Sequence, residues 1–356
     1  MEKKRIAYLD LVRVVACVLV VLVHVAAREV EYYNVESWQY VVANAFHILA
    51  FSGVPLFVMI SGALVLRPEK EMGIKDLLIK KTLHFFILYY IWKFIYQIVM
   101  MQEQGIPLSG ETIKTELILA LVKQRGYYHL WFLPMLAILY MTVPLIKKSV
   151  AEKNVCRYFL GVFMVVALLF PTLFLYEFKF KYMFVSLFSY NDFSFFSGYL
   201  GYFILGHYLH CWQQDITAKK RGWLLLTGVA AFLLACILGT HAAREAGMPD
   251  YGMQSPFVIT NFFTTVGIFL ACQSIGNKRE VRQDTMEHPP YRKAAELTFG
   301  IYLLHPLCLK VFEELKLERW LEAPMLTIPA VLAGTVLVSA FVTAWLKVIP
   351  ILRKLV

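Results

Sequence analysis

Apolar segments long enough to cross a lipid bilayer recur along the whole chain, and they restrict its fold more than any other feature. A spanning helix needs about 20 predominantly apolar residues, and with 59% hydrophobic residues the sequence is too apolar for a water-soluble domain. We therefore predict an all-α, polytopic integral membrane helical bundle of about ten transmembrane helices, forming one membrane-embedded domain over residues 1–356. The expected spans are residues 7–27, 39–66, 82–101, 129–146, 156–175, 196–212, 222–240, 256–275, 296–313 and 325–348.

The distribution of Lys and Arg predicts how these spans are oriented. Of the 35 Lys and Arg residues, 23 belong to the two termini and the connections on their side of the membrane, counting Arg157 and Lys347 at the adjoining ends of their spans, and 9 to the connections on the other side. Cytoplasmic segments of membrane proteins carry the excess of positive charge. We therefore expect a multi-pass protein of the cell (plasma or inner) membrane with both termini in the cytoplasm.

Net charge and cysteine content narrow the function classes. A net charge of +10 would suit nucleic acid, but in a membrane protein orientation and contact with anionic membrane lipid explain the same cations. The six cysteines lie mostly in apolar runs and show no Cys-x-x-Cys spacing, which argues against a metal site. We expect no nucleic-acid partner, no metal and no permanently bound cofactor. A homo-oligomer is compatible with the sequence.

The first apolar segment carries charge where a membrane span disfavours it. Arg or Asp at the centre of a span costs about 2.5–3.5 kcal/mol, which marks Asp10 and Arg13 as functional candidates. Arg13 and His24 are 11 residues apart, so they share one helix face about 16 Å apart along the axis. The expected orientation places Arg13 in the inner half of the membrane and His24 near the outer surface. Histidine suits general base catalysis, and arginine suits a phosphate or a developing oxyanion.

The second apolar segment is interrupted by small residues and by Pro55, which predicts a break in its helix. Two interpretations are open. The small residues could allow close helix packing, or the break could line a cavity, with Ser61 as a binding residue. His47, in the outer half of this segment, is either a satisfied core residue or a substrate contact.

Two later segments add polar candidates. His129 and Trp131 stand at the expected outer rim of a span, where aromatic residues commonly form an interfacial belt. In the ninth span, Tyr302 and His305 lie one turn apart at mid-depth, and Pro306 frees the backbone beside them. Polar side chains at this depth more often face the bundle interior than the lipid.

The expected outer connection, residues 176–199, is unusually rich in aromatic residues. Such residues are typical of the membrane interface. Together with Asn191 and Asp192, they would also suit a sugar.

At these residues the chain resembles the acyltransferase 3 family of integral membrane acyltransferases. The family pattern of Leu-Asp, an Arg, ten residues and a His is found as Leu9-Asp10, Arg13 and His24. A second signature, G-V-P-x-F-F-x-x-S-G, is similar to residues 53–62, with Val58 in place of the second Phe. The runs HLWFLPML, from His129, and FGIYLLHP, up to Pro306, resemble the Trp-Phe motif and the Tyr-Leu-x-His-Pro ending of the family.

The resemblance implies a fold, a donor and an acceptor. It implies transfer of an acyl group, commonly acetyl, from cytoplasmic acyl-CoA to a hydroxyl of a cell-surface or lipid-linked carbohydrate. It is closest to the stand-alone branch that O-acetylates surface polysaccharides or their lipid-linked precursors.

The resemblance also suggests roles for individual residues. Arg13 would hold the donor through a phosphate or the thioester carbonyl. His24 would activate the acceptor hydroxyl or briefly carry the acyl group. Tyr302 and His305 would complete the catalytic set. The expected substrate- or donor-binding residues are Asp10, Ser61, Trp131, His47 and His129.

The competing class is a transporter or flippase of a saccharide or a lipid-linked intermediate, because broken helices and intramembrane charges are also transporter traits. Against it, the broken second span has no evident counterpart in the second half of the sequence, as an internal repeat would require.

Overall fold

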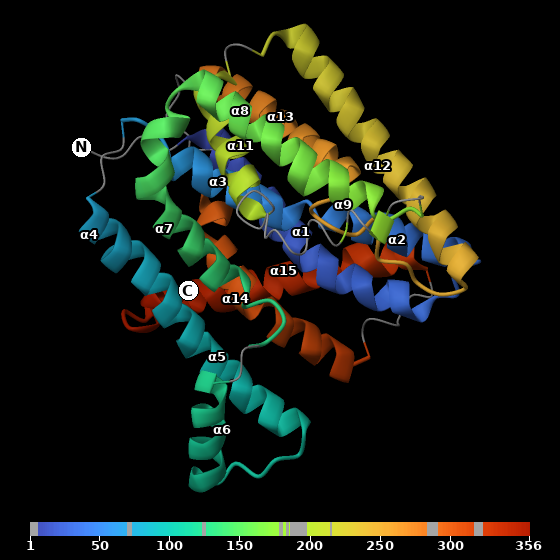
Figure 1. Cartoon of the computed structure of the whole chain (residues 1–356). Helices are drawn as coiled ribbons and strands as arrows, with labels where there is room; N and C mark the ends of the chain where they lie inside the picture. Colours follow the sequence, from blue (N-terminus) through green and yellow to red (C-terminus); the bar gives the residue numbers. More distant parts are fainter. Residues whose placement is uncertain are drawn as a thin grey trace. The chain divides into compact units, whose positions relative to one another are not determined.

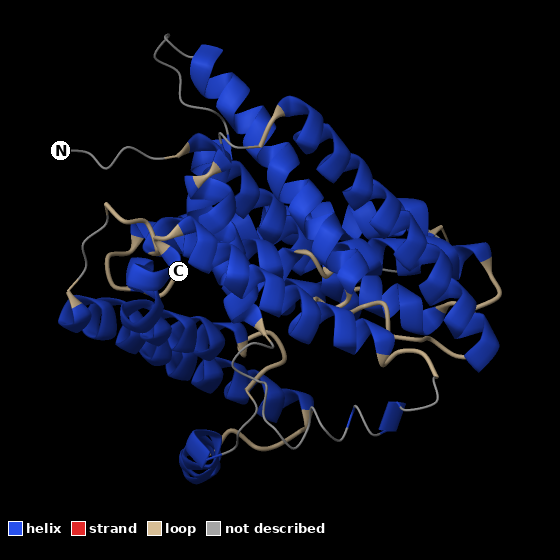
Figure 2. Cartoon of the chain, turned by 45° about the horizontal axis from the view of Figure 1, so that its top comes forward, coloured by secondary structure: helices blue, strands red, loops and turns tan. Residues whose placement is uncertain are grey.

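The computed structural model describes residues 6–69, 73–122, 126–177, 181–182, 185, 198–213, 216–282, 291–316 and 323–356. These residues form helices and no strand (Figure 2). The prediction of an all-α helical bundle is confirmed. Asn191 and Asp192 lie outside the described residues.

Nine helical segments within the described ranges are long and apolar enough to cross a membrane, which makes this a multi-pass membrane protein. They are Ala7–Tyr32, Trp38–Val65, Ile74–Glu103, Phe132–Val150, Lys153–Leu173, Ala218–Ala246, Ile259–Asn277, Tyr291–Glu314 and Pro324–Val348.

The expected span at residues 196–212 is shorter than the other spans. Its helix, α11, runs only from Tyr199 to Cys211, about 20 Å, against a hydrocarbon core about 30 Å thick. Gly198, immediately before it, has a φ of 135°, which glycine adopts readily and which cannot continue a helix. The apolar window extended across this backbone break.

The described residues fall into two compact units. The first comprises residues 1–64, 153–354 and 356, and the second comprises residues 65–152 and 355. The first unit contains α1 (Ala7–Tyr32), α2 (Trp38–Ala50), α3 (Gly53–Val65, whose last residue is assigned to the second unit), α8 (Lys153–Phe163), a π-helical turn (Met164–Leu169), α9 (Phe170–Leu173), α11, α12 (Ala218–Ala246), α13 (Ile259–Arg282), α14 (Tyr291–Glu314), α15 (Pro324–Val348) and a 3-10 turn (Leu352–Lys354).

Helix α1 is the central helix of this unit. It packs against α2, α13, α14 and α15 (Figure 1), and its apolar side chains form a large part of the core. Helix α12 packs against α13, and α14 against α15. Residues placed along α1 are therefore positioned by four neighbouring helices.

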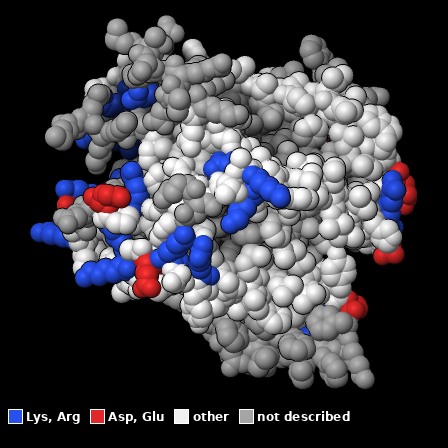
Figure 3. Space-filling model, turned by 90° about the horizontal axis from the view of Figure 1, so that it is seen from above, with Lys and Arg blue, Asp and Glu red and all other residues white. Residues whose placement is uncertain are grey.

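The outward faces of the peripheral helices are apolar. Large apolar side chains are exposed along α12 and α15, among them Leu226, Ile237, Leu337 and Phe341. In the view of Figure 3, the described surface is mostly neither acidic nor basic, and charged side chains gather in a few patches. A surface of this kind is stable in contact with lipid acyl chains.

The second apolar segment breaks where expected, because α2 ends at Ala50 and α3 begins at Gly53. A methyl group added at Gly53 would lie 2.9 Å from the backbone nitrogen of Val20 on α1. At Gly62 it would overlap the backbone of Phe203 on α11. At these positions the small residues allow close helix packing.

The second unit contains a continuous helical run from Ile74 to Glu103, made of α4 (Ile74–Leu77), a π-helical turn (Leu78–Leu83) and α5 (His84–Glu103), followed by α6 (Gly110–Val122) and α7 (Phe132–Val150). Helix α5 packs against α6 and α7. Tyr96 on α5 stacks on Tyr127 with ring centroids 4.4 Å apart, and the His129 ring lies edge-on to Tyr96 at 4.9 Å. His129 is buried, whereas Trp131 is 45% exposed.

Candidate active site

Two histidines from distant parts of the sequence lie against each other in the first unit. The rings of His24 on α1 and His305 on α14 are stacked, with centroids 5.3 Å apart and planes inclined by 21°. His305 is fully buried and His24 is half-buried. The packing of α1 against α14 brings them together.

The local backbone determines which nitrogen of His305 carries a proton. Its Nδ1 lies 2.7 Å from the carbonyl oxygen of Tyr302, and a carbonyl oxygen only accepts hydrogen bonds, so Nδ1 donates. That carbonyl is available because Pro306, four residues later, has no N–H to donate to it. In the neutral ring, Nε2 is then the basic nitrogen.

An ion pair connects the same two helices, one turn from His24 on α1 and two turns from His305 on α14. Arg28 follows His24 by four residues on α1, and its guanidinium lies 3.0 Å from the carboxylate of Glu313 on α14. The guanidinium also donates to the carbonyl of Leu309, 3.5 Å away and four residues beyond His305. These contacts hold α1 and α14 in the register that stacks the two rings.

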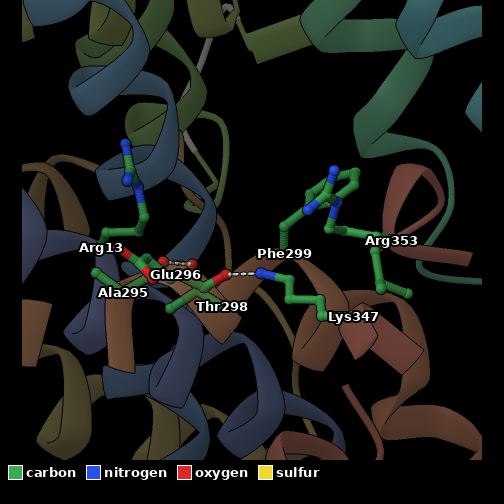
Figure 4. A pocket seen from close by; sticks show the side chains of 8 residues that line it. Arg13, Ala295, Glu296, Thr298, Phe299, Lys347 and Arg353 are labelled. Atoms are coloured by element: carbon green, nitrogen blue, oxygen red, sulfur yellow. Dashed lines mark hydrogen bonds between the residues drawn. The ribbon is translucent and has the colours of Figure 1, made fainter. Parts of the chain in front are cut away.

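A pocket of about 520 Å³ lies near the other end of α1. Arg13 and Arg353 lie on opposite sides of it in Figure 4. Lys347 donates a hydrogen bond to the carbonyl of Glu296 at the pocket wall. Three cations and one carboxylate give the lining a net positive charge. The lining residues are Arg13, Ala295, Glu296, Thr298, Phe299, Lys347, Arg353 and Val356.

The pocket and the histidine pair share two helices. On α1, Arg13 and His24 are three turns apart, about 16 Å along the axis. On α14, Thr298 lines the pocket, and Tyr302 and His305 follow on the same helix face. The lining of the pocket does not include His24.

The match to known protein families covers nearly the whole chain. A family model described as an acyltransferase domain, that of acyltransferase 3, matches residues 6–344. The chain belongs to the acyltransferase 3 family. No curated protein and no solved structure gave a significant match.

Membership of the acyltransferase 3 family establishes a membrane acyltransferase in general terms, and the matched region includes both the histidine pair and Arg13. Arg13 lies 3.4 Å from the carboxylate of Asp10, one turn earlier on α1. Asp10 is buried, so it stabilises the charge of Arg13 within the apolar part of the helix.

Two other sequence candidates of this acyltransferase lie on the broken second span. The hydroxyl of Ser61 donates to the carbonyl of Phe57, 3.1 Å away in the same helix. His47 is buried on α2 between the rings of Phe51 and Tyr251, with centroid distances of 5.2 and 6.3 Å. The roles expected for Ser61 and His47 stay predictions.

His129 and Trp131 belong to the second unit. Their expected contact with substrate also stays a prediction.

Sequence reasoning did not single out several residues around this site. Lys347 and Arg353 line the pocket, but they counted only as cytoplasmic positive charge. A further signal in the sequence was available. Lys347 ends the last span and Arg353 follows it, and the expected topology places both on the side of the membrane where the first span begins. The Arg28–Glu313 pair joins residues 285 positions apart, and no local pattern marks it. Among the described residues no cluster of His, Cys, Asp and Glu is arranged to hold a metal ion.

Proposed function

We propose that this acyltransferase transfers an acyl group, with acetyl the expected one, from cytoplasmic acyl-CoA to a hydroxyl of a cell-surface or lipid-linked carbohydrate. The reaction takes place in the cell membrane, with both termini of the protein in the cytoplasm. The observation that carries the proposal is that α1 bears a positively charged pocket at Arg13 and, three turns further on, the stacked pair His24 and His305.

The pocket suits the phosphates of an acyl-CoA. Phosphate groups favour arginine, which presents a planar fork of donors, and Arg13 and Arg353 provide two such groups. Lys347 adds a third cation. The excess of Lys and Arg on the side of both termini supports a cytoplasmic position of this pocket, where acyl-CoA is available.

The donor arm would then lie along α1 and α14 towards the histidine pair. The distance of about 16 Å between Arg13 and His24 along the helix axis is one that a pantetheine-like arm spans. The thioester would reach His24 at the end of that arm, while the nucleotide stays at the pocket.

At the histidine pair, the oxygen of the acceptor hydroxyl attacks the thioester carbonyl carbon and the carbon–sulfur bond breaks. His24 removes the hydroxyl proton, and the CoA thiolate leaves and is protonated. In the second form of this chemistry His24 itself attacks the thioester and then passes the acyl group to the hydroxyl. In either form, Nδ1–H of His305 donates to the carbonyl of Tyr302. Its Nε2 is therefore the nitrogen that can accept a proton.

Acyl transfer from radiolabelled acetyl-CoA by the purified protein tests this function. The wild type should release CoA, slowly to water and faster with a carbohydrate acceptor. His24→Ala and Arg13→Ala should each lose turnover while the thermal unfolding temperature stays close to that of the wild type. A general base typically contributes about 10²- to 10⁴-fold in rate, so the loss in His24→Ala should be of this order.

Matched controls separate the site from the general effect of a substitution. His241 on α12 is exposed and lies 3.6 Å from Glu245, and Arg157 on α8 is exposed and bonds to Tyr208. His241→Ala and Arg157→Ala should turn over like the wild type. A wild-type protein that neither binds acetyl-CoA nor releases CoA would contradict the proposal and favour transport of a saccharide.

A further inference from the structure

A cluster of buried polar side chains lies on α2, which packs against the helix of His24, and it has no part in the chemistry described so far. One face of α2 carries Tyr40, Asn44 and His47, because spacings of four and three residues bring side chains onto the same side of a helix. All three are buried. The segment between α12 and α13 contacts this face through Gln254 and Tyr251.

The cluster is only partly satisfied by its own hydrogen bonds. The amide of Gln254 donates to Asn44, 2.7 Å away, and that of Asn44 donates to Thr240, 3.3 Å away. Three buried atoms of the described residues, Tyr40 Oη, His47 Nδ1 and Gln254 Oε1, lack a hydrogen bond of standard geometry. Within the described ranges, their only interactions of this kind are weak ones, of His47 with Gln254 and of Tyr40 with the backbone of Asp250. Buried polar atoms in proteins are normally well paired, so three weakly paired ones in one place favour a ligand that would form stronger hydrogen bonds with them.

The chemistry of these atoms defines the ligand. A phenol hydroxyl, an imidazole nitrogen and an amide oxygen together offer both donors and acceptors. None is charged as an acid, and the cluster holds no Lys or Arg. A neutral ligand with several hydroxyl groups therefore fits better than a phosphate or a carboxylate.

Tyr251 connects the cluster to the predicted outer surface. Its ring lies edge-on to that of His47, it is 47% exposed, and its hydroxyl donates to the carboxylate of Glu31 at the end of α1. Partial burial and the negative charge of Glu31 raise the pKa of Tyr251, so the hydroxyl stays a donor at neutral pH. An exposed aromatic ring above buried hydroxyl-binding groups is suited to stacking on a sugar ring.

The cluster is also close to the proposed chemistry. A charge on His47 would act electrostatically on His24, and α2 packs along α1. A hydroxyl bound at this face of α2 would be held on a helix that packs against α1, within electrostatic range of the group that removes its proton. The donor pocket, in contrast, lies at Arg13, which is about 16 Å from His24 along the axis of α1.

We propose that the Tyr40–Asn44–His47 face of α2, with Gln254 and Tyr251, is the binding site for the acceptor and recognises it as a saccharide. This inference rests on the proposed function only for the acyl transfer that follows binding. The binding of the saccharide itself does not depend on it. The saccharide can be free or part of a polymer, or it can be joined to a membrane lipid. Both sources offer the same hydroxylated ring.

Binding of defined glycosides to the full chain in lipid nanodiscs tests this proposal directly. The probes are methyl glycosides of glucose, galactose, mannose, rhamnose and N-acetylglucosamine, and octyl β-glucoside below its micellar concentration. At least one should raise the unfolding temperature of the wild type. A stronger effect of the octyl than of the methyl glucoside would assign the source to a lipid-linked saccharide, and equal effects would assign it to a free or polymeric one.

Gln254→Met removes the amide while keeping the volume of the side chain, and should abolish this shift. Gln102→Met, at an exposed glutamine of α5, is the matched control and should keep it. Tyr251→Phe should respond like the wild type because the ring is kept, and Tyr251→Ala should not.

With labelled acetyl-CoA, Gln254→Met should lower the ratio of transfer to hydrolysis about 2- to 10-fold, the change expected for one lost hydrogen bond. An equal ratio in Gln254→Met and Gln102→Met, or no response of the wild type to any glycoside, would overturn the site. A glycoside shift that depends on Gln254, in a protein that releases no CoA, would support the site and overturn the proposed function.

Discussion

The ring of His24 is stacked on that of His305 at 5.3 Å, although 281 residues separate them in the chain. The contact unites the first and the ninth expected spans, and the Arg28–Glu313 pair, one turn from His24 and two turns from His305, joins the same two helices. Two imidazoles with ring centroids 5.3 Å apart disfavour simultaneous protonation, because two like charges at this distance repel. The arrangement therefore favours a pair in which at least one ring is neutral and able to accept a proton.

Replacing His305 by phenylalanine should abolish most of the activity without disturbing the packing. The phenyl ring preserves the stack with His24, but offers no nitrogen. We expect turnover of acetyl-CoA to fall about 10²- to 10⁴-fold, as for loss of a general acid–base group. Initial rates with radiolabelled acetyl-CoA measure this. His241→Phe, at a histidine whose side chain is 69% exposed, should keep the wild-type rate. Comparable rates in both variants would show that His305 only fills space.

The replacement of Pro306 by alanine should separate stability from activity. Alanine restores a backbone N–H that competes with Nδ1 of His305 for the Tyr302 carbonyl. It also removes a proline from a helix interior, where proline is disfavoured by about 3 kcal/mol. We expect a higher unfolding temperature together with turnover lowered about 10-fold, the size of effect of about one hydrogen bond.

The control for this variant is Pro329→Ala, because Pro329 also lies inside a helix, in α15, away from the histidine pair. It should change the unfolding temperature and leave turnover at the wild-type level. Unaltered turnover in Pro306→Ala would rule out a role for the freed carbonyl.

The positive pocket predicts a specific effect on donor binding. Arg353 is exposed at the pocket wall, where a single charge contributes about 1 kcal/mol or less. Arg353→Ala should therefore raise KM for acetyl-CoA about 2- to 5-fold with little change in kcat, and weaken the dependence of KM on salt. Steady-state kinetics at two salt concentrations measure both. Arg157→Ala removes the same charge elsewhere and should leave KM unaltered; an equal rise in this control would indicate a general effect of net charge.

The close approach of α3 to α1 predicts a stability effect at Gly53. A methyl group there would lie 2.9 Å from the backbone nitrogen of Val20 and 3.1 Å from the carbonyl oxygen of Ala16, neither of which moves without shifting α1. We expect Gly53→Ala to destabilise the fold by about 1–3 kcal/mol. Thermal unfolding in detergent provides the measurement.

Gly161 on α8 provides the comparison, since nothing lies within 4 Å of a methyl group added there. Because alanine favours the helix over glycine by about 0.8–1 kcal/mol, Gly161→Ala should raise the unfolding temperature. A Gly53→Ala protein as stable as Gly161→Ala would show that α1 and α3 separate at little cost.

Nine of the ten expected spans, with their approximate limits, could be predicted because these depend on local hydropathy. A stretch of apolar residues lowers its free energy in lipid whatever its neighbours are. The same is true of the shared helix face of Arg13 and His24, which follows from 3.6 residues per turn. The short length of α11 was not predicted, because hydropathy does not reveal the backbone break at Gly198.

The candidate site could be predicted only as a set of residues, and tertiary packing decided which of them meet. His305 contacts His24 because α14 packs on α1, and Lys347 shares a pocket with Arg13 because α15 packs on the same helix. The partners of His47 come from the connection between α12 and α13. Each contact depends on side-chain complementarity between helices far apart in sequence, whereas the local pattern of a helix determines only which residues share its face.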